Sequence, residues 1–380
     1  MKALRVEMIV PAMVPAGMEM VVARLTRRLA ARGHDVAITC IEYLGDLGER
    51  LRREGVPVEV AYSPGLRTIV YPAALVRRLR DRRPDVVHVH SGAWIKGARA
   101  AAFARVPRVI HTEHGLLDHE PSYAPLIKQW AARYTAAVAA VSAPLLTYLR
   151  EVDGLPPAKL RVVPNGIDTD VFQPDGRPGN LRTRFGIGAE RFVIGHVARL
   201  SPVKNHRLLL DAFALLHEAR PEAFLALIGD GDLRPQIETR ISELGLADHV
   251  GLYGVAHDLP PLYRELDVFV LSSLAEGTSM SILEAMSSAL PVVATDVGGN
   301  ADLLGETGVL VPSGDPAALA TAIGRVIADP AGRRAMGCAA RRRIVHEYDE
   351  ELVTDRYEAL YRNEAAAPSV PALAAQTCAE

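Results

Sequence analysis

The sequence predicts an α/β protein made of two doubly wound domains in tandem, and three observations carry this prediction. The chain has 380 residues, which is long for a single hydrophobic core. Short apolar runs alternate with amphipathic segments, which is the rhythm of parallel strands covered by helices on both faces. That rhythm is interrupted at the Pro- and Gly-rich stretch 170–183, which we interpret as a linker, and then starts again.

The first domain is predicted to open with a buried strand at residues 4–10. The segment that follows is amphipathic and ends on Gly33, as a helix C-terminus typically does. Further strands are expected at 35–41, 58–62, 85–90, 107–112, 136–142 and 160–166. After the linker, six more apolar runs predict the second sheet: RFVIGHV, AFLALIGDG, HVGLYG, DVFVLSS, PVVATD and GVLVPSG.

These runs define the expected domain organisation. We expect two Rossmann-like domains, at 1–172 and 173–345, with a ligand cleft where the carboxyl ends of their strands face each other. A C-terminal helix at 346–363 is expected to pack back towards the first domain. The remaining residues, 364–380, form a low-complexity tail that is expected to be disordered.

Composition excludes several classes of function. Lys and Arg number 43 against 45 Asp and Glu, and a net charge of -2 gives no support to nucleic-acid binding. Cys40, Cys338 and Cys378 form no CxxC pair, which favours a reducing cytoplasm over a disulfide framework. The opening residues are interpreted as a strand rather than a signal peptide, and no apolar run reaches a transmembrane length.

Two carboxylates stand eight residues apart in the stretch LAEGTSMSILEAM. Glu276 lies just before a helical pattern and Glu284 lies inside it. Two acids admit a glycosidase interpretation, with one acid and one nucleophile. Glu284 also fits a capping box with Ser281, which would make it structural. Glu276 has no such packing role, because it lies in a loop beside a glycine.

Residues that favour the binding of an anion lie near Glu276 and Glu284. The turn Gly277-Thr278-Ser279 precedes a helix, whose N-terminal amides and dipole attract negative charge. Arg199 and Lys204 lie in the loop after the first strand of the second domain, where each alone would be interpreted as solvated. Together they can grip two sides of a diphosphate.

At this point the sequence resembles a known family. Arg199 with Lys204, the EGTSMSILEAM stretch, NGID at 165–168 and GVLVPSGDP at 308–316 are similar to the retaining glycosyltransferases of family 4, which have the GT-B fold. The resemblance runs from about residue 4 to residue 360. TEHG and NGIDTDVF look most like bacterial transferases that build exopolysaccharides or other cell-envelope glycans.

The resemblance implies a role for each matched residue. Glu276 would bind hydroxyls of the donor sugar, and Glu284 would hold the nucleotide ribose. In VPAGMEM, Gly17 would let the diphosphate approach the backbone, although Ala16 stands where the family commonly has a second glycine. The implied catalytic residues are His114, Arg199, Lys204 and Glu276, and the implied donor-binding residues are Gly17, Gly229, Val255, Gly277, Thr278, Ser279, Met280 and Glu284.

No metal is predicted, and no cofactor is needed besides the nucleotide-sugar donor. His111, Glu113 and His114 in HTEHG suggest a metal, but the sequence offers no partner ligands. The resemblance favours His114 as a contact of the donor sugar instead. The Asp-x-Asp triplet 168–170 is interpreted as a turn. His88 and His90 alternate along a strand and are left unassigned.

The implied function is transfer of a sugar from a nucleoside-diphosphate sugar, with uridine favoured over guanosine, to a hydroxyl acceptor. The first domain would bind that acceptor, a sugar or a lipid-linked sugar. A nucleotide-sugar 2-epimerase of the same fold and a non-catalytic nucleotide-sugar binding protein remain as alternatives. A glycosidase is least favoured, because it has no use for a phosphate site.

The last expectation concerns a basic helix in the first domain. Arg77, Arg78, Arg80, Arg82 and Arg83 lie in the stretch LVRRLRDRRPD. A solvated helix face is the ordinary interpretation. The sharper one is peripheral contact with an anionic membrane on its cytoplasmic face, where a lipid-linked acceptor would be.

Overall fold

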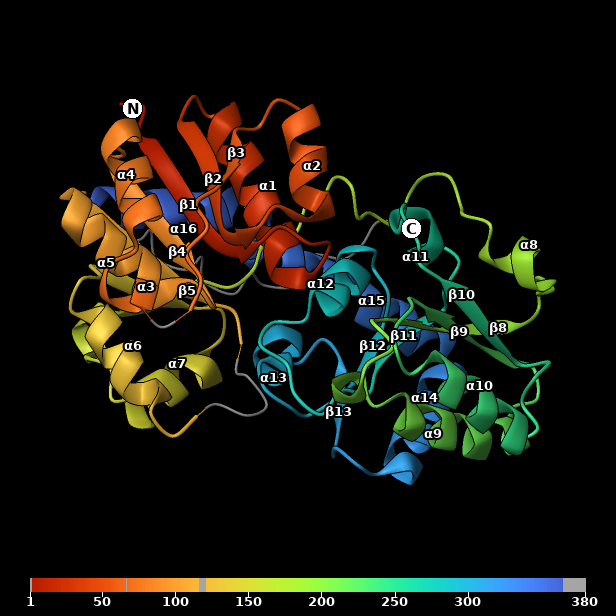
Figure 1. The fold of residues 1–380 in the computed structure, drawn as a ribbon. Helices are drawn as coiled ribbons and strands as arrows, with labels where there is room; N and C mark the ends of the chain where they lie inside the picture. The colour runs from red at the N-terminus through yellow and green to blue at the C-terminus, as the bar shows by residue number, and fades with distance from the viewer. Residues whose placement is uncertain (1, 66, 116–120, 365–380) are drawn as a thin grey trace. The chain divides into compact units, whose positions relative to one another are not determined.

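A computed structural model describes residues 2–65, 67–115 and 121–364. The chain divides into two compact units. Unit 1 contains the residues up to Gly166 and the final helix, which starts at Glu350; unit 2 runs from Ile167 to Asp349. Figure 1 shows unit 1 mainly in red to yellow and unit 2 mainly in green to blue. The predicted tail, 364–380, lies outside the described residues except for Glu364.

Unit 1 is built on a seven-stranded parallel sheet with the order β3-β2-β1-β4-β5-β6-β7. Its strands are β1 (Arg5–Ala12), β2 (Asp35–Tyr43), β3 (Val58–Val60), β4 (Val86–His90), β5 (Arg108–Glu113), β6 (Ala137–Ala140) and β7 (Leu160–Val162). Its helices are α1 (Gly17–Ala31), α2 (Gly45–Arg53), α3 (Arg67–Val70), α4 (Ala73–Arg82), α5 (Trp94–Ala104), α6 (Ala124–Ala132), α7 (Ala143–Glu151) and α16 (Glu350–Arg362), with a 3-10 turn η1 (Pro157–Lys159).

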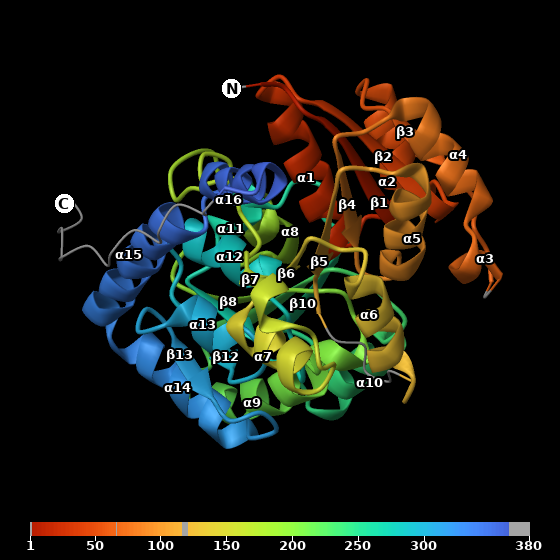
Figure 2. The ribbon, with the colours of Figure 1, turned by 90° about the vertical axis from the view of Figure 1, so that its left-hand side faces the viewer.

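Helices cover both faces of this sheet. Successive residues of a strand point to opposite faces, so each strand packs against helices on both sides. On β1, Met8 packs with residues of α1 and α16, whereas Ile9 packs with residues of α4 and α5. Figure 2 shows α1 and α16 on one face of the strands and α4 and α5 on the other. The near-continuous apolar runs of the sequence follow from this double burial.

Unit 2 repeats the plan with a six-stranded parallel sheet in the order β10-β9-β8-β11-β12-β13. Its strands are β8 (Phe192–Val197), β9 (Ala223–Ile228), β10 (Val250–Gly254), β11 (Val268–Leu271), β12 (Val292–Thr295) and β13 (Val309–Val311). Its helices are α8 (Leu181–Phe185), α9 (His206–Ala219), α10 (Arg234–Glu243), α11 (Pro260–Tyr263), α12 (Met280–Ser287), α13 (Asn300–Leu304), α14 (Pro316–Ala328) and α15 (Pro330–Glu347), with a 3-10 turn η2 (Pro202–Lys204).

Two apolar layers again enclose the sheet. Phe269 of β11 lies in the cluster that includes α12 and α15, and Val270 lies in the cluster that includes α9 and α14. The predicted fold class, two doubly wound parallel-sheet domains, is therefore confirmed in each unit.

The chain passes between the units at Gly166–Ile167 and at Asp349–Glu350, rather than within 170–183. Residues 170–183 belong to unit 2, because Phe172 is buried in its core and the amide of Gly179 donates to the carbonyl of Pro261 at 3.0 Å. The Pro- and Gly-rich composition that suggested a linker therefore belongs to a segment packed on one unit.

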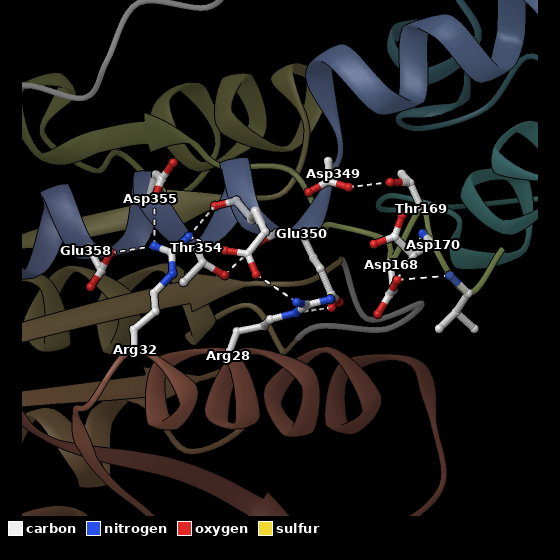
Figure 3. A network of polar contacts seen from close by, with 12 residues as sticks. Arg28, Arg32, Asp168, Thr169, Asp170, Asp349, Glu350, Thr354, Asp355 and Glu358 are labelled. Carbon is white, nitrogen blue, oxygen red and sulfur yellow. Dashed lines mark hydrogen bonds and ion pairs between the residues drawn. The ribbon is translucent and has the colours of Figure 1, made fainter. Parts of the chain in front are cut away.

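A turn follows the first passage, and ion pairs hold the chain directly after the second (Figure 3). In unit 1, Arg28 of α1 pairs with Glu350, and Arg32 pairs with Asp355 at 2.6 Å. In unit 2, the Asp168 carboxylate accepts hydrogen bonds from the amides of Asp170 and Val171 at 3.1 and 3.0 Å. This is a local side-chain turn, which confirms the turn interpretation of the triplet 168–170.

The arginines in α4 and directly after it differ in their contacts and exposure. Arg82 and Arg78 form ion pairs with the buried Glu7 of β1 at 2.6 and 3.2 Å, so their charges face the sheet. Arg77, Arg80 and Arg83 are exposed. Within the described part of the chain, no helix combines the length and the apolar character needed to cross a bilayer.

Candidate active site

The loops that follow the strands of unit 2 are joined to one another by backbone hydrogen bonds. The amide of Leu200, after β8, donates to Asp230, after β9, at 3.0 Å. The amide of Gly229 donates to Gly254 at 2.9 Å, and the amide of Leu274, after β11, donates to Val203 at 2.7 Å. The carboxyl ends of β8, β9, β10 and β11 therefore form one connected surface, where ligands of open α/β sheets bind.

An ion pair lies at the centre of this surface. The Lys204 ammonium lies 2.6 Å from Glu276 Oε1, and the hydroxyl of Ser273 donates to the same oxygen at 2.6 Å. The Glu276 side chain is only 9% exposed. Predicted residues separated by 72 positions in sequence are thus in direct contact, and a charge-assisted pair of this kind fixes both side chains.

The other predicted residues of unit 2 lie on the same loops. Arg199 is exposed and has no ion-pair partner among the residues described. Gly229 has φ of 137°, and a Cβ there would lie 2.0 Å from the carbonyl oxygen of Ala198, so close packing requires glycine. Val255 directly follows Gly254, which bridges to Gly229, and its side chain is exposed.

Helix α12 presents its N-terminus to the loop that carries Glu276. Ser279 is the N-cap, and its hydroxyl accepts from the amide of Ile282 at 3.4 Å. Met280 and Ser281 open the helix, so their amides have no acceptor within it. The capping-box interpretation of Ser281 with Glu284 is wrong, because Ser281 lies inside the helix and the cap is two residues earlier.

Glu284 lies in the second turn of α12 and is buried. Its carboxylate accepts a hydrogen bond from the hydroxyl of Tyr263, at the end of α11, at 2.9 Å. A buried carboxylate needs such partners, so this contact orients the acid from a neighbouring helix.

Gly298 supports the Glu276 loop by having no side chain. Its φ is 53°, and a Cβ at this position would lie 1.8 Å from the carbonyl oxygen of Glu276. We expect Gly298→Ala to displace the loop that carries Glu276 and to lower both activity and stability, the latter by about 1–3 kcal/mol. Chemical denaturation and a transfer assay measure the two effects.

Gly314 is the matched control for this variant. It also has a positive φ, 85°, but its Cβ would meet open space. Gly314→Ala should therefore show the backbone cost without the loss of activity. Equal activities for the two variants would contradict a supporting role for Gly298.

The two predicted residues of unit 1, Gly17 and His114, follow β1 and β5, which lie on either side of β4. Gly17 is the exposed first residue of α1, and a Cβ there would meet nothing within 4 Å. The amide of His114 donates to the hydroxyl of Ser91 at 2.9 Å. Burial lowers the pKa of His114 to about 4, although Glu113 acts in the opposite direction.

Buried histidines also occur in unit 2. His206, the first residue of α9, is 2% exposed and stacks edge-on against His196 at 4.8 Å. Burial lowers the pKa of His206 to about 4, and the charge of Lys204 lowers it further. Burial also holds the pKa of His196 well below its ordinary value, so both histidines stay neutral in the folded chain below the pKa of about 6.5 that is usual for an unfolded one.

The difference in the pKa of His206 between the folded and the unfolded chain predicts how the free energy of unfolding depends on pH. Between pH 6.5 and 4 the unfolded chain binds a proton at His206 that the folded chain does not, so stability present above pH 6.5 is lost as the pH falls. One such proton corresponds to a slope of about 1.4 kcal/mol per pH unit. Urea unfolding of the wild type and His206→Asn at several pH values should show a shallower slope in the variant; identical slopes would contradict the assignment.

Among the described residues, no group of three or more His, Cys, Asp and Glu side chains is arranged to hold a metal ion. His111 is instead stacked on Trp94, with ring centroids 3.9 Å apart, and its Nε2 lies 3.3 Å from Glu113. These two residues of HTEHG therefore belong to the interior packing of unit 1.

Three supporting residues were missed in the sequence: Ser273, Tyr263 and Gly298. The only sequence signal for Ser273 is that a polar residue follows an apolar strand. The only signal for Gly298 is the pair of glycines at 298 and 299, which indicates a turn. Tyr263 gave no signal, because its contact with Glu284 depends on how α11 packs against α12.

Comparison with known proteins agrees with these features. The model of Glycosyltransferase Family 4 matches residues 15–171, and that of Glycosyl transferases group 1 matches residues 191–329. The UDP-Gal:α-D-GlcNAc-diphosphoundecaprenol α-1,3-galactosyltransferase of Escherichia coli is 30% identical over 301 residues, 76% of this chain and 78% of that protein. The putative glycosyltransferase EpsD of Bacillus subtilis is 30% identical over 276 residues, 68% of this chain and 71% of that protein.

Solved structures share the fold. HepE of Anabaena in complex with UDP aligns with a TM-score of 0.84 and 24% identity, covering 95% of this chain and 100% of that chain. WaaG, a glycosyltransferase involved in lipopolysaccharide biosynthesis, aligns with a TM-score of 0.70 and 18% identity, covering 97% and 100%. With both family models matched in order and the fold shared along the chain, this protein belongs to glycosyltransferase family 4 and has the GT-B fold.

Proposed function

We propose that this glycosyltransferase moves a sugar, with retention of configuration, from a nucleoside-diphosphate sugar to a hydroxyl acceptor. The observation that carries the proposal is the contact of Lys204 with Glu276 beside the N-terminus of α12. A UDP-sugar is favoured over a GDP-sugar, since the E. coli relative is named for UDP-galactose and HepE was solved with UDP.

The cations and helix amides suit the diphosphate. Arg199 and Lys204 supply positive charge, and the opening amides of α12, around Thr278 to Met280, supply hydrogen-bond donors next to the positive end of the helix dipole. Gly229 and Val255 lie on neighbouring loops that would approach the nucleotide through backbone atoms.

Glu276 is placed and charged so that it can bind hydroxyls of the donor sugar. In the ligand-free chain its carboxylate is held by Lys204 and Ser273. A carboxylate accepts up to about four hydrogen bonds, so the same group can receive donor-sugar hydroxyls while remaining fixed. His114 of unit 1 is proposed as a second contact of the sugar, and Gly17 as a point of close approach to the diphosphate.

The reaction breaks the bond between the anomeric carbon and the phosphate oxygen and forms a bond from that carbon to the acceptor oxygen. Negative charge develops on the departing diphosphate, where Arg199, Lys204 and the α12 amides would stabilise it. The acceptor attacks the face that the diphosphate leaves, and its proton passes to the departing phosphate oxygen. No protein nucleophile is required.

The acceptor is proposed to be a sugar or a lipid-linked sugar in the synthesis of cell-envelope glycan, exopolysaccharide or glycolipid, in line with the undecaprenol-linked acceptor named for the E. coli relative. The enzyme would then work in the cytoplasm, at the membrane surface. The exposed Arg77 and Arg80 of α4, with Arg83 directly after the helix, are the candidates for contact with anionic lipid. Sedimentation with anionic vesicles, lost on charge reversal of these three, tests this contact.

A panel of nucleotide sugars in a thermal-shift assay tests the proposed donor. A ligand bound by the native state alone, at a hundred times its Kd, stabilises it by about 3 kcal/mol. We expect UDP-sugars to give the largest rise in melting temperature and a glycoside product to form with acceptor. Release of a free epimer would favour an epimerase, and no rise with any nucleotide sugar would contradict the proposal.

Glu284 is proposed to hold the ribose, which predicts a binding defect. Glu284→Gln removes the charge without changing the shape of the side chain, so affinity for the nucleoside diphosphate should fall about tenfold, the worth of one charged hydrogen bond. Titration calorimetry measures this change.

Tyr263→Phe is the control for a purely structural role. It removes the hydroxyl that donates to Glu284 and leaves the carboxylate in place. If Glu284 serves only this contact, both variants lose stability and neither loses affinity, which would contradict the ribose assignment.

A further inference from the structure

Two histidine rings of unit 1 meet at the carboxyl ends of β4 and β5. His90 is the last residue of β4 and pairs in register with Thr112 of β5, two residues before His114. His90 Nδ1 lies 3.0 Å from His114 Nε2, which is hydrogen-bond distance. The ring centroids are 5.3 Å apart with a tilt of 34°.

Each ring has one further nitrogen, and both of these are buried. His90 Nε2 and His114 Nδ1 have no hydrogen-bond partner among the described residues, from which 116–120 are excluded. Burial holds the pKa of His114 at about 4 and that of His90 well below its ordinary value. Both rings are therefore neutral near pH 7, and each carries a single N–H.

Two neutral rings in contact restrict each other's tautomers. If His90 donates from Nδ1, His114 accepts at Nε2 and carries its hydrogen on Nδ1. If His114 donates from Nε2, its Nδ1 presents a lone pair. The contact thus links the two rings: the tautomer of His90 decides whether the remaining nitrogen of His114 is a donor or an acceptor.

His90 is itself held firmly. Its ring packs against that of His88, with centroids 4.2 Å apart and a tilt of 38°. Both nitrogens of His88 are engaged, with the hydroxyls of Thr112 and of Tyr361 in α16, each at 2.7 Å. The hydroxyl of Tyr357 lies 3.1 Å from that of Thr112. This buried network gives the His90 ring a fixed orientation.

We propose that His90 is a positioning residue for the transfer reaction: it sets the orientation and the tautomer with which His114 meets the donor sugar. The inference rests on the proposed function, because it takes His114 as a contact of the sugar. It differs from simple core packing, in which His90 would support the fold and its replacement would act independently of His114.

A double-mutant cycle separates the two roles. His90→Phe keeps a flat ring but cannot hydrogen-bond to His114, and we expect it to lower kcat by about 10- to 100-fold, the cost of misplacing a reacting group. Affinity for the nucleoside diphosphate, measured by calorimetry, should stay close to the wild-type value. In a His114→Ala background, His90→Phe should cause no further loss. A loss of the same size in both backgrounds would overturn the proposal, as would wild-type activity of His90→Phe.

Two amide variants of His90 test whether it acts through its Nδ1. The side-chain amide of asparagine can occupy the position of a histidine Nδ1, whereas that of glutamine reaches one bond further. His90→Asn should recover most of the activity that His90→Phe loses, and His90→Gln should recover less. Equal recovery by the two would contradict an action through Nδ1.

Ring-nitrogen NMR of histidine-labelled protein adds a readout that needs no substrate. The His114 signals, assigned by their absence in His114→Ala, should show one tautomer in the wild type and a mixture in His90→Phe. Unchanged signals overturn the inference. If the wild type transfers sugar and His114→Ala does so equally well, the inference fails while the proposed function stands. If the wild type binds no nucleotide sugar, the proposed function fails.

Discussion

Replacing Lys204 by alanine is expected to lower the turnover of sugar transfer by about a hundredfold or more. The ammonium lies at the carboxyl ends of the unit 2 strands, 2.6 Å from Glu276, where charge on the departing diphosphate would develop. Removal of one such preorganised contact typically costs this much. Arg199→Ala should have an effect of the same order, because the two cations are proposed to grip the diphosphate together.

Stability must be measured beside activity, because Lys204→Ala also leaves the Glu276 carboxylate without its cation. A poorly exposed charge that loses its partner costs about 1–3 kcal/mol. The double variant Lys204→Ala with Glu276→Gln should recover that stability without recovering activity. Arg207→Ala, which removes a side chain 80% exposed on α9, is the matched control and should behave as wild type. Near wild-type turnover of both Lys204→Ala and Arg199→Ala would contradict the diphosphate assignment.

Replacing Glu276 by glutamine is expected to lower transfer by a similar factor while leaving affinity for the nucleoside diphosphate nearly unchanged. The amide keeps the shape of the carboxylate but has one acceptor oxygen instead of two, and its NH₂ group would face Lys204. Fewer hydrogen bonds to the sugar would then form in the transition state, which lowers kcat.

Calorimetry with the nucleoside diphosphate and kinetics with the full donor are the paired measurements for this variant. The nucleoside diphosphate lacks the sugar, so it does not sample the proposed contact. A loss of affinity equal to the loss of turnover would place Glu276 at the nucleotide rather than at the sugar.

The strands and their loops were predictable because burial on both faces gives a parallel strand a continuous apolar run. The position of Arg199, Lys204 and Glu276 on loops at the carboxyl ends of strands was predictable, because each follows an apolar run. The contact between Lys204 and Glu276 was not, because it depends on the pairing of two loops through Val203 and Leu274. Local periodicity carries no information about such pairings.

Other misinterpretations have equally specific causes. Ser279 and Ser281 are two residues apart, and only the observed start of α12 shows which of them caps the helix. The linker interpretation of 170–183 rested on composition, which does not show that Phe172 is buried in unit 2. A signal for the pairing of Arg78 and Arg82 did exist: Glu7 is a charge inside an apolar strand, and a buried charge requires a partner.

The backbone conformation of Ala289 was not predictable, because its φ of 57° lies in the left-handed region that favours glycine. For His90, the alternation of residues along β4 indicated only that it shares a face of the sheet with His88. Its contact with His114 could not be predicted, because it depends on the register of β4 with β5.

A crystal structure of this chain with bound UDP would show whether the nucleotide binds as proposed. We expect the two phosphates at the N-terminus of α12, in contact with Arg199 and Lys204, and the ribose hydroxyls at Glu284. A nucleotide bound with its phosphates on other residues would contradict the proposal.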